Sequence, residues 1–110
     1  MSGTAVAWVI LLVAALLEIV WAIALKEADG FSKLGPTVVG LVAAATSFAL
    51  LTFALRQLPI GTAYAVWVGI GAVGVAAAGI IARGESASPP RLLFLGLILV
   101  GVAGLRAVEA

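Results

Sequence analysis

The chain of 110 residues is 65% hydrophobic and only 10% charged, whereas about half of the residues in a soluble domain are apolar and about a quarter are charged. Its formal net charge of +1 gives no basic surface of the kind that binds nucleic acid. It has no cysteine and no histidine, which excludes disulfide bonds, thiolate metal sites and the usual imidazole ligand or base. We therefore expect a membrane protein with no metal and no other cofactor.

Long apolar segments make up most of the chain. Ala5–Leu25 contains a single charged residue, and Leu34–Leu55 and Ile60–Ala82 contain none. A helix of about 20 apolar residues crosses a hydrocarbon core of about 30 Å. The fourth segment, Leu92–Leu105, is shorter and crosses only if its flanking arginines extend to the interfaces. A re-entrant or surface helix is the alternative for this segment.

The connections between the segments are short and contain residues that begin or end helices. Asp29-Gly30 is a turn pair, and Pro36 and Pro59 stand where a first helical turn tolerates a missing N–H. The chain leaves no room for an extramembrane domain. We therefore expect a single four-helix transmembrane domain over residues 1–110, with helices at approximately 4–26, 34–56, 60–82 and 91–107.

The basic residues fix the orientation of these helices poorly. With four spans, one membrane face carries Lys26, Lys33, Arg83 and Arg91, and the other carries Arg56 and Arg106. Four against two is a weak bias under the positive-inside rule. Either the charges are too few to decide, or the chain inserts in both orientations. The second reading predicts an antiparallel pair related by a two-fold axis in the membrane plane.

Small residues at helical spacing favour close helix contacts, which replace the missing hydrophobic drive inside lipid. The stripes are Gly61, Ala65 and Gly69, then Gly74, Ala78 and Ala82, and finally Gly96, Gly101 and Gly104. Four helices cannot readily enclose a substrate pathway, whereas two copies supply eight, so we expect the last stripe to pack between subunits. The alternative is that glycine is simply common in membrane helices.

Glu18 is the strongest functional signal, because it lies near the middle of the first apolar segment. Placing a carboxylate at the bilayer centre costs from about 2.5 kcal/mol upward, so an idle glutamate there is not expected. Burial disfavours the charged form, while a bound cation favours it. Proton and cation would then compete for one site, which is the minimum chemistry of an antiporter. The alternative is a protonated Glu18 that serves only as a hydrogen-bond donor between helices.

Polar and aromatic side chains at matching depths suit a cation site. They are Trp21, Ser47, Tyr64 and Trp67. Trp21 shares a helical face with Glu18 at i+3. Indole N–H and hydroxyl groups can donate to a carboxylate, and aromatic ring faces attract cations. The alternatives are membrane-interface anchoring for Trp and Tyr and back-bonding for Ser. Trp8, near the first interface, is expected to be such an anchor.

One motif does not carry its usual meaning. Gly69–Gly74 matches G-x-G-x-x-G, but a nucleotide-binding fold needs this motif between a strand and a helix. Here it lies inside an uncharged membrane segment, so close packing or a helix bend is the better interpretation.

Together these residues resemble the small multidrug resistance family, and within it the guanidinium exporter branch. The similar stretches are Trp8, Glu18–Lys26, Gly30-Phe31, Leu58–Gly74 and Gly84–Ser88. The resemblance covers nearly the whole chain. It implies an all-α membrane protein that works as an antiparallel, dual-topology homodimer in a bacterial-type inner membrane. It also implies a transporter, not an enzyme, that exports guanidinium in exchange for protons by alternating access.

The resemblance also implies roles for individual residues. Glu18 would bind substrate and proton, Ser47 and Trp67 would support it through hydrogen bonds, Trp21 would shape the site and Tyr64 would line it. Trp21 distinguishes this branch from the drug exporters, which have a Gly-Thr pair in this stretch. One departure is Ala15, where the family pattern has glycine, and whose methyl group we expect to face the pocket.

Two alternatives remain at this point. The first is a quaternary ammonium or multidrug cation exporter of the same fold. The second is a membrane assembly subunit that does not transport, in which Glu18 is only a structural hydrogen-bonding group.

Overall fold

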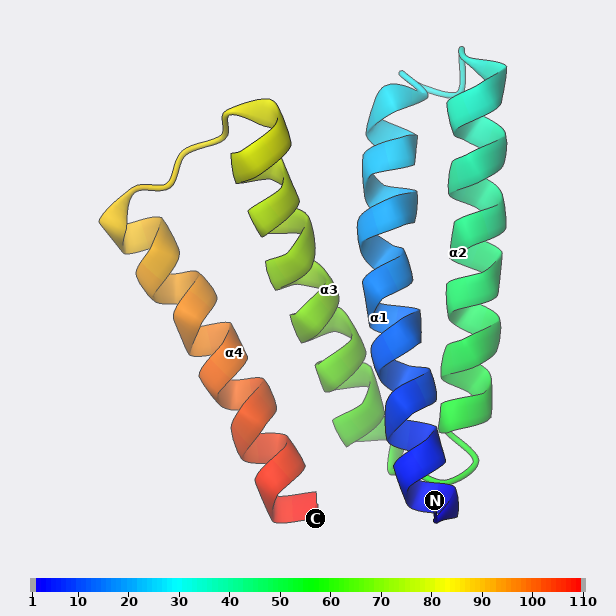
Figure 1. Cartoon of the computed structure of the whole chain (residues 1–110), viewed down its shortest axis with the longest axis vertical. Helices are drawn as coiled ribbons and strands as arrows, with labels where there is room; N and C mark the ends of the chain where they lie inside the picture. The colour runs from blue at the N-terminus through cyan, green and yellow to red at the C-terminus, as the bar shows by residue number, and fades with distance from the viewer. Residues whose placement is uncertain (1, 110) are drawn as a thin grey trace.

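The computed structural model describes residues 2–109 and contains four α-helices within them (Figure 1). They are α1 (Gly3–Glu27), α2 (Leu34–Ala54), α3 (Ile60–Arg83) and α4 (Pro89–Glu109). All four are long and apolar enough to cross a membrane. The helix α4 is longer than its apolar core suggested, because it begins at the Pro-Pro pair and continues past the last arginine. The predicted all-α fold with four transmembrane helices is confirmed.

The helix α1 lies at the centre of the arrangement. It packs against α2 along most of its length and against α3, whereas α3 alone brings its backbone close to α4. Figure 1 shows α1 and α2 side by side, α3 leaning away from α1 toward its C-terminal end, and α4 on the far side of α3. The three helices α1, α2 and α3 therefore form the unit in which a site can be enclosed.

The helix ends follow local chemistry. The Ser2 hydroxyl accepts a hydrogen bond from the Ala5 N–H at 3.0 Å, which caps the start of α1. The α1–α2 connection turns through three successive residues with positive φ, of which only Gly30 adopts this conformation freely. Gly84 ends α3 in the same left-handed conformation, as is usual for a helix C-terminus.

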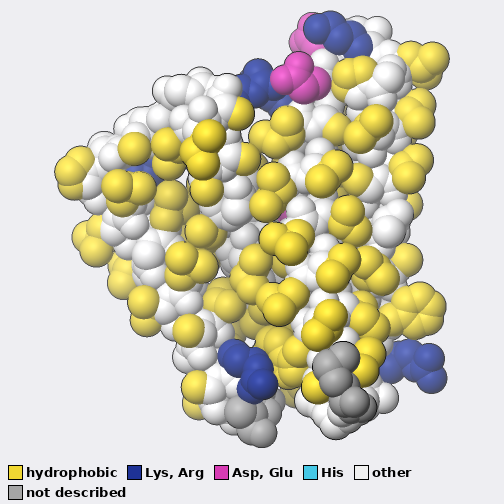
Figure 2. All heavy atoms as spheres, viewed as in Figure 1, with side chains coloured by type: hydrophobic (Ala, Val, Ile, Leu, Met, Phe, Trp, Pro, Cys, Tyr) yellow, Lys and Arg dark blue, Asp and Glu magenta, His cyan; other side chains and the backbone are white. Residues whose placement is uncertain are grey.

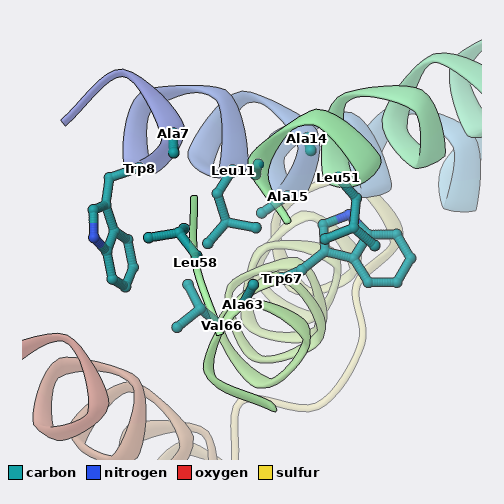
Figure 3. Close-up of a cluster of buried hydrophobic side chains, with 11 residues drawn as sticks. Ala7, Trp8, Leu11, Ala14, Ala15, Leu51, Leu58, Ala63, Val66 and Trp67 are labelled. Carbon is teal, nitrogen blue, oxygen red and sulfur yellow. The ribbon is translucent and has the colours of Figure 1, made fainter. Parts of the chain in front are cut away.

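A core of apolar side chains joins α1, α2 and α3 in the N-terminal half of α1 (Figure 3). Its members are Ala7, Trp8, Leu11, Ala14, Ala15, Leu51, Ala54, Leu58, Ala63, Val66 and Trp67. The many alanines let the helix backbones approach closely. Trp8 is only 8% exposed, and the Arg106 guanidinium lies 4.9 Å from the centre of its ring. Trp8 was predicted to be an anchor at the first membrane interface, but its ring packs inside the protein against the other helices.

Glycines of α3 mark its contacts with two different neighbours. A methyl group on Gly74 would lie 2.6 Å from Ile19 Cδ1 of α1, and one on Gly69 would lie 2.7 Å from Val102 Cγ2 of α4. The segment Gly69–Gly74 is thus continuous membrane helix that packs closely on both sides, as its composition indicated. A methyl group on Gly61 would meet nothing within 4 Å, so that part of the stripe makes no contact within the described chain.

The surface has the pattern of a membrane protein. Apolar side chains cover the visible face, and charged side chains gather at its two ends (Figure 2). No residue of α4 whose burial the structure describes is buried, and its glycines at positions 96, 101 and 104 face open space. Lipid or another protein chain must therefore cover this helix.

Candidate functional site

A cavity of about 480 Å³ lies between α1, α2 and α3. Its lining is largely apolar and aromatic, with Glu18 as the only charged residue. The residues that line it are Glu18, Trp21, Ala22, Phe48, Tyr64, Trp67, Val68, Gly71, Ala72 and Val75. A concave apolar site with a few converging polar groups is the usual form of a small-molecule site.

Glu18 enters this cavity from the middle of α1 and is only 7% exposed. Its carboxyl group occupies the space beside the backbone of Gly71 on α3. A methyl group built on Gly71 would overlap the Glu18 carboxyl group. The Glu18 carboxyl group can lie here because Gly71 has no side chain.

The Glu18 carboxylate accepts no hydrogen bond from the protein within residues 2–109, and it forms no ion pair there. A carboxylate has two oxygens with about four acceptor positions. These positions are all available to a ligand with several donors. Among the same residues, no group of three or more His, Cys, Asp or Glu could hold a metal ion.

Ser47 and Trp67 form a hydrogen-bonded chain behind the cavity wall. The Trp67 Nε1 donates to the Ser47 hydroxyl at 3.1 Å, and this hydroxyl donates to the Ala14 carbonyl of α1 at 2.7 Å. Both side chains are buried. We expected the Ser47 hydroxyl to donate to a carboxylate, but its single proton is used on the Ala14 carbonyl. In this conformation Ser47 and Trp67 hold the wall of the cavity without a hydrogen bond to Glu18.

Three further aromatic rings complete the site. The Tyr64 ring lies 5.7 Å from the Trp67 ring, and the Phe48 ring lies 5.2 Å from it on the α2 side. Both contacts are tilted, a common arrangement for aromatic pairs. The Trp21 Nε1 is buried and finds no hydrogen-bond partner in the described part of the chain. Trp21 and Glu18 line the same cavity, so this unpaired donor is available for an acceptor that comes within reach.

The structure thus places four of the five predicted site residues on one cavity, Glu18, Trp21, Tyr64 and Trp67, and puts Ser47 directly behind it. Phe48 was missed, since an aromatic residue in an uncharged span is indistinguishable from a lipid-facing one. Its position next to Ser47 was the only available signal. Ala15 is fully buried in the apolar core and does not line the cavity, so the expectation that its methyl group faces the pocket is wrong.

Known proteins resemble this chain over most of its length. A family model described as Small Multidrug Resistance protein matches residues 6–98. Proteins named guanidinium exporter from Salmonella typhimurium strain LT2 and Citrobacter freundii are each 58% identical over 99 residues, which is 90% of this chain and 94% of theirs. One of the same name from Yersinia pseudotuberculosis is 59% identical over 100 residues, 91% of this chain and 96% of its own. These names describe transporters and not enzymes, as the sequence led us to expect.

Proposed function

Because the chain belongs to the small multidrug resistance family and is a multi-pass inner-membrane protein, we propose that it exports guanidinium in exchange for protons by alternating access. The observation that carries this proposal is the buried carboxylate of Glu18, which lies in a cavity lined by aromatic rings and accepts no hydrogen bond from residues 2–109. The relatives named guanidinium exporter support the choice of cation.

The chemistry of the cavity suits a planar cation with donors along its edge. Guanidinium presents N–H pairs that match the two oxygens of a carboxylate. Its flat faces can stack on indole and phenol rings, which attract cations. The Glu18 carboxylate supplies the acceptors, and the rings of Trp67 and Tyr64 supply the faces.

Exchange follows from the competition of two ligands for Glu18. Guanidinium needs the ionised carboxylate, whereas a proton neutralises it. If the site faces one side of the membrane at a time, the cation released on one side is replaced by a proton. The proton then returns to the other side, where the next cation displaces it. Proton flow down its gradient would in this way drive the cation outward.

The remaining site residues have proposed roles consistent with their positions. Ser47 holds Trp67 at the cavity wall through the hydrogen bond between them. The Trp21 indole N–H would donate to the Glu18 carboxylate once the side chains move closer. Tyr64, at the exposed edge of the cavity, would line the path of the cation.

The working unit that we propose is an antiparallel homodimer. The exposed apolar surface of α4 and its open glycines would be covered by a second copy. Basic residues are few on both membrane faces, which allows insertion in both orientations. Two Glu18 carboxylates would then share one pathway, and their protons would dissociate in coupled steps.

One observation favours a second candidate, an exporter of quaternary ammonium ions. The residues Phe48 and Tyr64 line the cavity and are 52% and 55% exposed, so they offer aromatic side chains to a cation without donors. A bare carboxylate with free acceptor positions is of less use to such a cation. We therefore rank guanidinium first.

The deciding experiment compares the two cations on purified protein in liposomes with an imposed pH gradient. We expect the gradient to drive guanidinium, and to drive tetraethylammonium at least about ten times more slowly. The Glu18→Gln protein keeps a hydrogen-bonding side chain but cannot exchange a proton, so it should be inactive. Gradient-driven transport by Glu18→Gln would refute the role of Glu18. Faster movement of tetraethylammonium would support the second candidate, and no transport of either would favour an assembly subunit.

A further inference from the structure

An ion pair joins the C-terminal ends of the two helices that form most of the cavity. Glu27 is the last residue of α1 and Arg83 the last residue of α3, and the Arg83 guanidinium contacts the Glu27 carboxylate. The Arg83 side chain is 31% exposed and that of Glu27 is 51% exposed. The pair therefore lies at the protein surface, where water can reach both groups.

This pair lies beyond the cavity, toward the α1–α2 and α3–α4 connections. On α1, Glu27 is five positions past Ala22, which lines the cavity, and this corresponds to about 8 Å along the helix. On α3, Arg83 is eight positions past Val75, or about 12 Å. The Glu27–Arg83 pair thus lies at the ends of both helices, beyond the cavity-lining residues of each.

The two helices diverge at this end. Figure 1 shows α3 leaning away from α1 toward its C-terminus, and Figure 2 shows basic and acidic side chains next to each other between the two helices there. The close contact between Gly74 and Ile19 lies nearer the membrane centre. Past that contact, the atoms nearest to a methyl group on Gly79 would be those of the Glu85 carboxylate in the α3–α4 connection. The Glu27–Arg83 ion pair therefore joins α1 and α3 at the end toward which α3 leans away from α1 (Figure 1).

The described residues contain a second ion pair that serves as a natural comparison. Glu85 Oε1 accepts from Arg91 Nη2 at 2.9 Å, with side chains 50% and 32% exposed. Like the first pair, this one joins a glutamate to an arginine, and its side chains are about equally exposed. However, Glu85 lies in the α3–α4 connection and Arg91 at the start of α4. Only the Glu27–Arg83 pair bridges α1 and α3.

We propose that Glu27 and Arg83 form a gate across the loop end of the Glu18 cavity. With the ion pair formed, the ends of α1 and α3 are held together and the cavity is closed toward this membrane face. When the pair separates, the helix ends part and the cavity opens to that side. An exposed ion pair is weak enough to break and form again in each transport cycle. The role of this gate in transport rests on the proposed export function. Whether the gate is open or closed can be measured without any transported ion.

The first test measures access to the cavity. The chain has no cysteine, so Ala22→Cys places a single thiol in the cavity lining. The protein is placed in liposomes, and its rate of reaction with a membrane-impermeant maleimide is measured with no substrate present. We expect Glu27→Gln or Arg83→Gln, added to Ala22→Cys, to raise this rate about 2- to 5-fold, the change that loss of an exposed pair allows. The charge reversal Glu27→Arg with Arg83→Glu should return the rate to that of Ala22→Cys alone.

The matched control for this test is Glu85→Gln, which removes an equally exposed carboxylate from an ion pair on the same face. It should leave the labelling rate unchanged. The gate is refuted if Glu27→Gln also leaves the rate unchanged. It is equally refuted if Glu85→Gln raises the rate as much, since a general loss of surface charge would then be the cause.

The second test locks the gate. Cysteines at positions 27 and 83 are joined within one chain by a short bifunctional thiosulfonate reagent that a reductant removes. We expect guanidinium transport to fall at least about tenfold in the joined protein and to recover after reduction. The same treatment of cysteines at positions 85 and 91 should leave transport intact. Undiminished transport in the protein joined at 27 and 83 would overturn the gate.

The two tests separate this inference from the proposed function. If the labelling rate responds to Glu27→Gln but guanidinium is not transported, the gate holds and the assigned cation is wrong. If guanidinium is transported and the labelling rate does not respond, the gate alone is wrong.

Discussion

The indole Nε1 of Trp67 donates a hydrogen bond to the hydroxyl of Ser47 at 3.1 Å, and through this hydroxyl three helices are connected. Because Ser47 in turn donates to the Ala14 carbonyl at 2.7 Å, one side chain of α2 fixes both α1 and α3. The chain of bonds is buried, so water cannot replace a lost partner. It holds Trp67 in the orientation in which its ring faces the cavity.

Ser47→Ala should therefore weaken both folding and transport. The Trp67 Nε1 would be left as a buried donor without a partner, at a cost of about 1–3 kcal/mol. We expect a lower melting temperature of the purified protein and at least about a fivefold loss of guanidinium transport. Thr46→Ala is the control, since the Thr46 hydroxyl is exposed and bonds only to the Val42 carbonyl of its own helix. Equal effects of both substitutions would contradict the role given to Ser47.

Gly71→Ala should displace the Glu18 carboxylate, because the added methyl group would take the space that this carboxylate occupies. The carboxyl group would have to turn further into the cavity, away from its present position beside Gly71, so we expect guanidinium to bind at least about tenfold more weakly. Binding can be followed by calorimetry on protein in detergent. Gly61→Ala is the matched control in the same helix, where a methyl group meets nothing within 4 Å. Unchanged affinity in Gly71→Ala would show that the carboxylate can move aside freely.

Acidification should weaken guanidinium binding. In the proposed mechanism the cation binds the ionised form of Glu18, so every proton added to this carboxylate removes a binding site. The apparent affinity should fall as the pH is lowered, by at most about tenfold per pH unit for one proton per site. Measured affinities over a range of pH test this, with Glu18→Gln as the reference in which neither strong binding nor the pH effect should remain. A guanidinium affinity that rises as the pH is lowered would exclude direct competition between the proton and the cation for Glu18.

Phe48→Ala should change which cations are accepted more than how well guanidinium binds. In the proposed site guanidinium binds the oxygens of Glu18, whereas a quaternary ammonium ion would bind ring faces, and this substitution removes one of these faces. We expect at most about a threefold loss for guanidinium and a larger loss for tetraethylammonium in a binding assay. A larger loss for guanidinium would mean that Phe48 positions Trp67, which its ring contacts at 5.2 Å.

Composition and spacing were sufficient to predict the four helices and the depth of Glu18. A charge in a long apolar run can be placed from the sequence alone, and Trp21 at i+3 must share its helical face. The roles of Glu18, Trp21, Ser47, Tyr64 and Trp67 in transport stay predictions. Their shared location in and behind one cavity is what the structure adds to them.

The details that sequence reasoning missed depend on how the helices are rotated against one another. Whether the Ser47 hydroxyl meets Glu18 or Ala14 is decided by a few ångströms of helix packing, which no periodicity encodes. The same rotation buries Trp8 in the core and turns the Ala15 methyl group away from the cavity. Phe48 looks like any lipid-facing residue until α3 is placed beside it.

The close fit of Glu18 against Gly71 has a consequence for how the cation preference could evolve. A methyl group at position 71 would already overlap the Glu18 carboxyl group, so any residue larger than glycine there would displace it. Phe48 and Tyr64 also line the cavity, and both residues are about half exposed. Substitutions that adapt the cavity to bulkier cations should therefore accumulate at positions 48 and 64. Position 71 should stay glycine in such variants.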